Sequence, residues 1–397
     1  MVSAREPAKA RRYLERAIQI DALADRKMAF ISGPRQVGKT TLGRALLSSP
    51  NNVFSWDDQR FRRAWARDPV LALEARGPGP VLLDEIHKDR RWKTRLKGVY
   101  DLRGESLPLV VTGSARLDYF RRGGDSLMGR YLPYRLHPFS VAEGSEPVGP
   151  DAVLQAPRVQ YPWCNLLRLG GFPEPLLAAS EHKARRWSRL RTERIVQEEV
   201  RDFRHVHDLQ ALRVLVDLLP DRVGSLLSVN ALREDVGVAY ATVRDWVLVL
   251  ESLYHGFFVR PHAGRLSRAL RAEPKLYLFD VLAVADPAAR RENLAALHLL
   301  KACQYWTDTA QGDFELRFVR TKDGEEVDFL LLRDRRPWML VECKTSDTTP
   351  SRALVKFARL LGTAINVQLV DRKGYDRLLP EPNVRVMDTE RFFAMLV

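Results

Sequence analysis

The sequence predicts a multidomain α/β protein, and three observations lead to this fold class. The chain has 397 residues, enough for two to three domains of about 150 residues each. Short apolar runs alternate with helical patterns in its first third, helical patterns dominate its middle, and apolar runs return near its end. Hydrophobic residues make up 45% of the chain and charged residues 29%, as in ordinary globular proteins, which excludes a disordered or low-complexity chain.

Four apolar runs in the first third predict the buried strands of a parallel sheet. They cover residues 27–32, 52–56, 80–84 and 107–112, and helical patterns lie between them. Strands that alternate with helices in this way are typical of a βαβ-type domain. A stretch rich in proline and glycine, at 143–157, predicts the end of this domain.

A phosphate-binding motif follows the first of these runs. Residues 33–40 read GPRQVGKT and fit the pattern G-x-x-x-x-G-K-[ST] at every position, with a predicted strand before them and a helical pattern after them. Backbone N–H groups of such a loop surround phosphate oxygens at the positive end of the helix. Lys39 would place its charge near the β- and γ-phosphates of ATP, and the Thr40 hydroxyl would bind Mg²⁺.

Two further strand ends carry polar residues that suit this chemistry. Asp84, which ends the run at 80–84, would complete the Mg²⁺ shell, and Glu85 would orient the attacking water. Ser114, or the neighbouring Thr112, would lie near the γ-phosphate, although a hydroxyl that caps the strand end is the alternative. The predicted ATP-binding residues are Gly33, Pro34, Arg35, Gln36, Val37, Gly38, Lys39, Thr40, Thr41 and Ser114, with Thr40 and Asp84 on the metal.

Arginines after the fourth run are candidates for an arginine finger, which stabilises transition-state charge on the nucleotide of a neighbouring subunit. The candidates are Arg116, Arg121, Arg122 and Arg130. In a chain so rich in arginine, an ordinary surface charge is the alternative for each of them. We predict that Arg130 is the finger, and that it completes a catalytic set with Lys39 and Glu85.

These motifs resemble the AAA_14 branch of the AAA+ ATPases. The resemblance rests on SGPRQVGKTTL at 32–42, VLLDEIHKDRRWKTRLKGVYD at 81–101, VVTGSARL at 110–117 and SLMGRYLPYRLHPFSVAE at 126–143. It implies a Mg²⁺-dependent ATP hydrolase whose subunits assemble as a ring or an open spiral. The sequence departs from typical AAA+ proteins in having Ser or Thr where a sensor Asn is common.

The middle of the chain predicts a winged helix. Apolar residues recur at helical spacing on both sides of a turn at Gly237, Ser228 could cap the first helix, and the run FFVRP could form a wing strand. The exposed residues at the start of the second helix would be Tyr240, Thr242 and Arg244, where a recognition helix meets DNA. The alternative is a protein-interaction module of the same fold.

A second polar constellation lies near the end of the chain. Asp328 and Glu342 each adjoin a strongly apolar run, and alternation along a strand places Glu342 and Lys344 on one face. A hairpin that sets Asp328 beside Glu342 would provide two carboxylates for Mg²⁺ and a lysine to position a water. This D…E-x-K pattern is the active-site signature of restriction-endonuclease-like folds, and surface ion pairs are the alternative.

Glu292, ahead of a helical pattern, supplies a third acid for the same site. The runs PKLYLFD, RRENLAALHLL, GEEVDFLLL and VECKTS resemble the DUF4143 domain that commonly follows AAA_14. This resemblance implies a winged helix plus a PD-(D/E)xK nuclease-like fold, with Glu292, Asp328, Glu342 and Lys344 in its acidic and lysine positions. A degenerate nuclease fold that only clamps nucleic acid is the alternative.

The predicted architecture is therefore α/β throughout, with four parts. An AAA+ P-loop ATPase core with a parallel sheet covers 1–145, and a helical lid or connector covers 146–220. A winged-helix DNA-binding region covers 221–275, and a restriction-endonuclease-like α/β domain covers 276–397.

The net charge of +14 and the pI of about 9.9 favour a polyanionic partner, nucleic acid before membrane, although an arginine-rich composition alone is the alternative. No apolar run is long enough to cross a bilayer, and the N-terminus lacks the apolar core of a signal peptide, which predicts a cytoplasmic protein. Cys164, Cys303 and Cys343 support neither a disulfide framework nor a zinc site.

These observations predict a Mg²⁺-dependent ATPase that uses ATP and Mg²⁺, forms a homo-oligomer, and couples hydrolysis to binding or remodelling of DNA. A basic multi-subunit assembly could engage several arms of branched DNA. Two alternatives stay open at this point. One is an ATP-dependent nuclease that cuts DNA at the C-terminal site, and the other is an ATP-switched regulatory protein that binds proteins through its winged helix.

Overall fold

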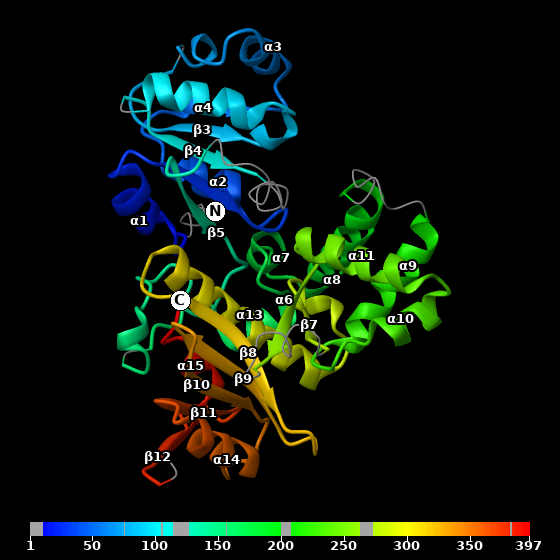
Figure 1. Cartoon of the computed structure of the whole chain (residues 1–397). Coiled ribbons are helices and arrows are strands. Elements are labelled where there is room, and N and C mark those ends of the chain that lie inside the picture. Colours follow the sequence, from blue (N-terminus) through cyan, green and yellow to red (C-terminus); the bar gives the residue numbers. More distant parts are fainter. Residues whose placement is uncertain are drawn as a thin grey trace, which may run out of the picture. The chain divides into compact units, whose positions relative to one another are not determined.

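The computed structural model describes residues 11–74, 76–104, 106–113, 127–155, 157–199, 208–262, 273–381 and 383–397 (Figure 1). The chain divides into two compact units, Met1–His137 with Glu143–Pro147 and Pro138–Ala142 with Val148–Val397. Among the described residues, no helix is both long and apolar enough to cross a membrane.

The first unit is built on a five-stranded sheet in which every pairing is parallel. The strands lie in the order β2-β3-β4-β1-β5 and are β1 (Met28–Ser32), β2 (Val53–Ser55), β3 (Val81–Asp84), β4 (Leu109–Thr112) and β5 (Tyr131–Arg135). The α-helices are α1 (Glu15–Ile18), α2 (Lys39–Ala45), α3 (Gln59–Arg67) and α4 (Trp92–Arg103). The parallel sheet and its first four strands confirm the sequence-based prediction.

Strand β5 was not predicted, and its sequence explains why. It reads YLPYR and contains Pro133, which has no N–H to donate to a sheet ladder. Because β5 lies at the edge of the sheet, the missing donor leaves no neighbouring strand unpaired.

The core of the first unit lies between this sheet and the helices α3 and α4. Buried Phe30, Val81 and Val111 of the sheet pack in one cluster with Trp65 of α3 and Leu96 of α4. This packing fixes the positions of the carboxyl ends of β1, β3 and β4, where the candidate site lies.

The second unit begins with helices and continues into a sheet (Figure 1). Its helices are α6 (Trp163–Leu169), α7 (Pro173–Leu177), α8 (Glu181–Arg194), the π-helix η6 (Ile195–Glu199), α9 (Leu209–Leu218), α10 (Val229–Val236), α11 (Tyr240–Ser252), the 3₁₀-helix η9 (Val281–Ala283), α13 (Pro287–Asp308), α14 (Arg352–Leu361) and α15 (Thr389–Phe393). Its strands are β6 (Gly256–Pro261), β7 (Lys275–Leu278), β8 (Phe314–Arg320), β9 (Glu326–Arg333), β10 (Arg336–Cys343), β11 (Ile365–Val370), β12 (Asp376–Leu379) and β13 (Val384–Asp388).

Helices α10 and α11, called the helix-turn-helix below, are joined by a turn at Gly237 where the sequence predicts one, and the winged helix as a whole stays a prediction. The Ser228 side chain accepts a hydrogen bond from the backbone N–H of Ala231, so it caps α10 at its start. Gly237 ends α10 with φ of +77°, a left-handed conformation that costs glycine little. Buried Val243 and Val247 then hold α11 against the rest of the unit.

The eight strands lie in the order β12-β13-β11-β10-β9-β8-β6-β7 in one sheet. The predicted wing strand is β6, which pairs antiparallel with β7 and parallel with β8, so it belongs to the same sheet as the C-terminal strands. The domain boundaries at 145/146, 220/221 and 275/276 stay predictions.

Candidate functional site

The loop after β1 has the backbone conformation that a phosphate-binding loop requires. Gly33 has φ of +146°, and a Cβ there would lie 2.3 Å from the carbonyl oxygen of Leu136, so only glycine fits. Gly38 has φ of +97° and precedes the first residue of α2. The loop thus leads directly into a helix N-terminus, where backbone N–H groups point outward at an anion.

Lys39 and Thr40, the first residues of α2, carry the polar groups of this loop. The Lys39 ammonium is buried and donates hydrogen bonds to the carbonyl oxygens of Gly33 (3.0 Å) and Pro34 (2.7 Å). The Thr40 hydroxyl lies 3.1 and 3.2 Å from the two carboxylate oxygens of Asp84 at the end of β3.

Parallel pairing brings a third group to the same place. Asp84 is in register with Thr112 on the neighbouring strand β4, and the Thr112 hydroxyl also donates a hydrogen bond to the Asp84 carboxylate. Of the two hydroxyls predicted near the γ-phosphate, that of Thr112 therefore lies beside Asp84, and Ser114 lies outside the described residues. Two hydroxyls and a carboxylate are hard oxygen donors, so this set suits Mg²⁺ held between protein and phosphates.

Glu85 lies one residue beyond the strand and has a left-handed backbone, with φ of +57°. Its side chain is 20% exposed and lies 3.5 Å from the Lys88 ammonium and 3.8 Å from Nε2 of His87. The Glu85 carboxylate therefore lies near side chains of the following turn, one residue beyond Asp84.

Arg130, the predicted finger, lies at the opposite end of the sheet. It precedes β5, its carbonyl oxygen accepts a hydrogen bond from the N–H of Met28 at the start of β1, and its guanidinium pairs with Asp101 at 2.7 Å. Five residues of β1, or about 17 Å, separate this end of the strand from the P-loop. Arg130 therefore does not reach the P-loop of its own chain, and its role stays a prediction for a neighbouring subunit.

One supporting residue was missed in the sequence. The Arg12 guanidinium donates hydrogen bonds to the P-loop carbonyl of Val37 (2.7 Å) and to that of His137 (2.5 Å), and it pairs with Glu143 at 2.7 Å. Arg12 is 6% exposed, and the Glu143 side chain is fully buried. This buried ion pair ties the P-loop to the segment that carries the HPFSVAE motif.

The recognition-helix candidates all lie in the first turns of α11. Tyr240 and Arg244 are exposed and Thr242 is half-buried. The Arg244 guanidinium lies 2.9 Å from the Asp245 carboxylate, so a phosphate would compete with that neighbour for the arginine. The chain between β6 and β7, 263–272, lies outside the described residues.

The C-terminal residues that the D…E-x-K pattern singled out also meet. The Asp328 carboxylate accepts a hydrogen bond from the N–H of Cys343 (2.8 Å), the Asp328 N–H lies 3.4 Å from the Glu342 carboxylate, and the Lys344 ammonium pairs with Glu342 at 2.7 Å. Burial and the negative charges of Glu292 and Glu342 raise the pKa of Asp328. Burial also raises the pKa of Glu342.

A residue that the sequence did not indicate lies within this acidic cluster. Lys275, at the start of β7, is 3% exposed, and its ammonium lies 2.5 Å from Glu326, 3.3 Å from Glu292 and 3.9 Å from Asp328. Burial lowers the pKa of Lys275, but the surrounding carboxylates outweigh it and raise that pKa, so the side chain is charged. Within the described ranges, no group of three or more His, Cys, Asp and Glu side chains is arranged to hold a metal ion.

Comparison with known families assigns two of these regions. Residues 25–144, which hold the P-loop, β3 and β4, match the family described as "AAA domain". The first unit thus contains the region that matches an AAA domain. Residues 289–388 match the domain of unknown function DUF4143, so both resemblances inferred from the motifs are confirmed. Residues 162–285 match a further domain of unknown function, DUF8612. The match to an AAA domain supports ATPase activity in general.

Two relatives are similar to most of the chain, and both are described as uncharacterized. The chain is 25% identical over 371 residues to an uncharacterized protein of Mycobacterium tuberculosis, Rv2008c, and equally to Mb2031c of Mycobacterium bovis, covering 87% of this chain and 75% of each relative. Among solved structures, it is 16% identical to the RuvB Holliday junction branch migration motor of Thermotoga maritima, with a TM-score of 0.31 over 66% of this chain and 94% of that one. It is 15% identical to the ORC1 protein of Aeropyrum pernix in complex with DNA, with a TM-score of 0.31 over 72% of this chain and 93% of that one.

Proposed function

We propose that the AAA domain hydrolyses ATP with Mg²⁺ and that hydrolysis is coupled to DNA binding by the second unit. The observation that carries the ATPase part is the cluster of Lys39, Thr40, Asp84 and Thr112 at the carboxyl ends of three neighbouring strands. A bound Mg²⁺ would supply positive charge to neutralise the negative charge that develops on the phosphates. Thr40 and Asp84 would hold the ion.

The other residues of the site have separate tasks in this proposal. The Lys39 ammonium exchanges the carbonyl oxygens of Gly33 and Pro34 for phosphate oxygens, since an anion is the stronger acceptor. Glu85 accepts a hydrogen bond from the attacking water and orients it. Arg130 acts on the nucleotide of a neighbouring subunit, which makes a homo-oligomer part of the proposal.

The DNA part rests on charge and on the helix-turn-helix. The chain has a net charge of +14, and α11 presents Tyr240 and Arg244 to solvent at the end of the helix that enters DNA in such motifs. A basic multi-subunit assembly suits branched DNA. Because phosphate neutralisation releases counterions, binding should weaken steeply as salt is raised.

DNA binding is tested by fluorescence anisotropy of a labelled duplex and a labelled four-way junction with the whole chain. We expect Arg244→Glu to weaken binding about tenfold, within the range for one base or phosphate contact. Arg352→Glu is the matched control, because Arg352 is exposed on α14, away from the helix-turn-helix. If the two variants bind equally, α11 is not the reading element. If wild type binds neither DNA at low salt, the regulatory alternative takes the place of this proposal.

The position of Lys275 favours DNA binding without cleavage over the nuclease alternative. A metal ion in the acidic cluster would face a buried ammonium ion that already neutralises Glu292, Glu326 and Asp328. The cluster therefore does not fit a divalent cation, and we propose that this region binds DNA without cutting it. The check is incubation of plasmid DNA with wild type and Glu342→Ala in Mg²⁺ or Mn²⁺. Cleavage by wild type that Glu342→Ala abolishes would establish the nuclease instead.

A further inference from the structure

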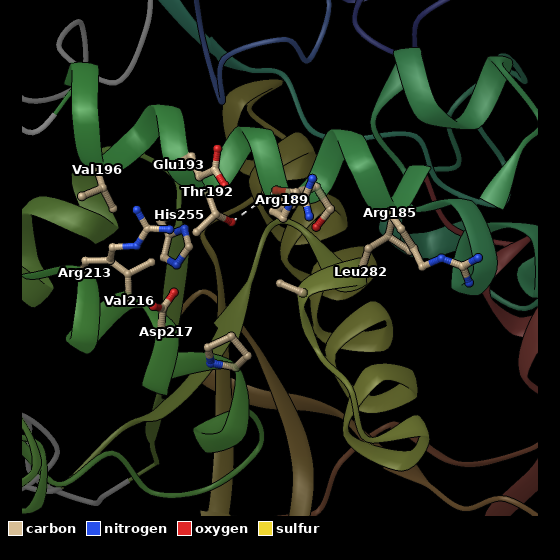
Figure 2. A pocket seen from close by; sticks show the side chains of 13 residues that line it. Arg185, Arg189, Thr192, Glu193, Val196, Arg213, Val216, Asp217, His255 and Leu282 are labelled. Carbon is tan, nitrogen blue, oxygen red and sulfur yellow. Dashed lines mark hydrogen bonds between the residues drawn. The ribbon is translucent and has the colours of Figure 1, made fainter. Parts of the chain in front are cut away.

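A cavity of about 480 Å³ lies within the second unit, among α8, α9, η9 and the start of β6 (Figure 2). Cavities of about 300–1,000 Å³ are the size that proteins use for small organic ligands. None of the residues that line it belongs to the P-loop, to the first turns of α11 or to the acidic cluster around Lys275. It is therefore separate from every site described above.

His255 gives this cavity an unsatisfied polar group. It lies in the cavity wall and is 3% exposed, and neither ring nitrogen has a hydrogen-bond partner in the described part of the chain. Burial, together with the charge of Arg191, lowers the pKa of His255 to about 3. The ring is thus neutral at physiological pH, with one donor and one acceptor available. Buried polar groups normally have partners, so an imidazole with both nitrogens unpaired beside a cavity is suited to bind the polar edge of a ligand.

The charged residues of the cavity favour an anion. Arg185, Arg189 and Arg213 line it, against two carboxylates, those of Glu193 and Asp217. Arg185 is turned toward Glu181, which its guanidinium approaches to 3.6 Å. Arg189 and Arg213 make no ion pair with any residue that the structure describes. Two arginines on different helices, α8 and α9, are thus available to one ligand (Figure 2).

The rest of the wall is apolar. Val196 and Val216 are buried, and Leu282 and Ala283 of η9 close another side. A simple inorganic anion would leave this apolar surface uncovered, whereas a ring or short hydrocarbon would bury it.

We propose that this cavity binds a small organic anion with an apolar or aromatic body, its charged group against Arg189 and Arg213 and its polar edge toward His255. The ligand would contact both α8 and α9. Since α9 packs on α10 of the helix-turn-helix, ligand binding would shift the position of that motif.

The test uses the whole chain and 8-anilinonaphthalene-1-sulfonate, an aromatic anion whose fluorescence rises in apolar sites. We expect saturable binding of one probe per chain in wild type, weakened about tenfold in Arg189→Glu and in Arg213→Glu. Arg186→Glu is the matched control, because Arg186 is exposed on the same helix but does not line the cavity. Equal probe binding in all four proteins, or no saturable binding in wild type, would overturn the proposal.

Competition separates charge from hydrophobicity. We expect phenyl phosphate to displace the probe from wild type, and phenol, which has the same ring without the charge, to leave it bound at the same concentration. Equal displacement by the two would contradict the anionic part of the proposal. Lys39→Ala should bind the probe as wild type does, so this result stands apart from that of the ATPase proposal.

Discussion

The P-loop site and the acidic cluster of the second unit both combine lysine and carboxylate side chains, but in opposite ways. In the P-loop, the Lys39 ammonium is held by carbonyl oxygens, and the Asp84 carboxylate is held by hydroxyls. In the acidic cluster, the Lys275 ammonium lies among the carboxylates themselves. A charged side chain readily exchanges an uncharged carbonyl or hydroxyl partner for a phosphate or a metal ion. It does not readily give up an oppositely charged partner in a buried ion pair. Similar residues thus predict a site that takes up ligands in one unit and a closed one in the other.

Lys39→Ala should have the largest effect on this comparison. The substitution removes the charge that stabilises the transferring phosphoryl group, and we expect the ATPase rate to fall about 1,000-fold. The measurement is phosphate release at saturating ATP and Mg²⁺. Lys97→Ala, on α4, is the control and should keep the wild-type rate. Retained activity in Lys39→Ala would place hydrolysis elsewhere.

Lys275→Met should have the next largest effect, because it removes a buried ammonium that lies among three half-buried carboxylates, those of Glu292, Glu326 and Asp328. We expect a loss of about 3–5 kcal/mol in the free energy of unfolding of the second unit. Lys344→Met serves for comparison: the Lys344 side chain is 40% exposed and its ammonium pairs with one carboxylate of the described residues, that of Glu342, so the loss should be about 0.5 kcal/mol. Mn²⁺ should raise the melting temperature of Lys275→Met and leave that of wild type unchanged. A rise in wild type would show that the cluster takes a metal after all.

Arg12→Ala sharpens the P-loop side of the comparison. It removes the buried guanidinium that pairs with the buried Glu143 carboxylate, and we expect a loss of about 3 kcal/mol in the stability of the first unit, measured by denaturant unfolding. Arg16→Ala, which breaks an exposed pair with Glu146, should cost less than about 1 kcal/mol. The account of Arg12 would be wrong if the two variants were equally stable.

His255→Gln should have the smallest effect, which appears only in how the free energy of unfolding depends on pH. The folded-state pKa of His255 is about 3, below the ordinary value of 6.5, so in acid the unfolded chain binds a proton that the folded chain does not. This contribution is present above about pH 6.5 and is lost as the pH falls toward 3. Between about pH 7.5 and 5.5, wild type should lose about 1.4 kcal/mol more than His255→Gln does. Identical losses in denaturant titrations would contradict a neutral, buried ring.

Local patterns were sufficient for several elements and motifs of this protein, although not for β5. The glycine spacing of 33–40, the apolar run before Asp84, and the Ser228 and Gly237 signals around α10 each act through neighbouring residues, and the structure has them where predicted. The placement of Asp328 beside Glu342 also followed from the alternation of side chains along the two strands of a hairpin.

What the sequence did not indicate depends on contacts between distant residues. Arg12 contacts Glu143, 131 positions along the chain, and Lys275 contacts Glu292, 17 positions along. The sequence patterns that we used single out neither Arg12 nor Lys275. The cavity at His255 likewise needs α8, α9 and η9 to be packed before it exists. Such residues carry no periodic or spacing signal, and only the folded structure brings them together.

The central claim, that ATP hydrolysis is coupled to DNA, is tested most directly by the ATPase rate with and without DNA. Duplex, single-stranded and four-way-junction DNA would each be added to the whole chain at low salt, with Lys39→Ala as the inactive control. We predict that at least one DNA form stimulates wild type and that stimulation disappears as salt is raised. A wild-type rate that ignores every DNA form, at concentrations where anisotropy shows DNA to be bound, would contradict the coupling.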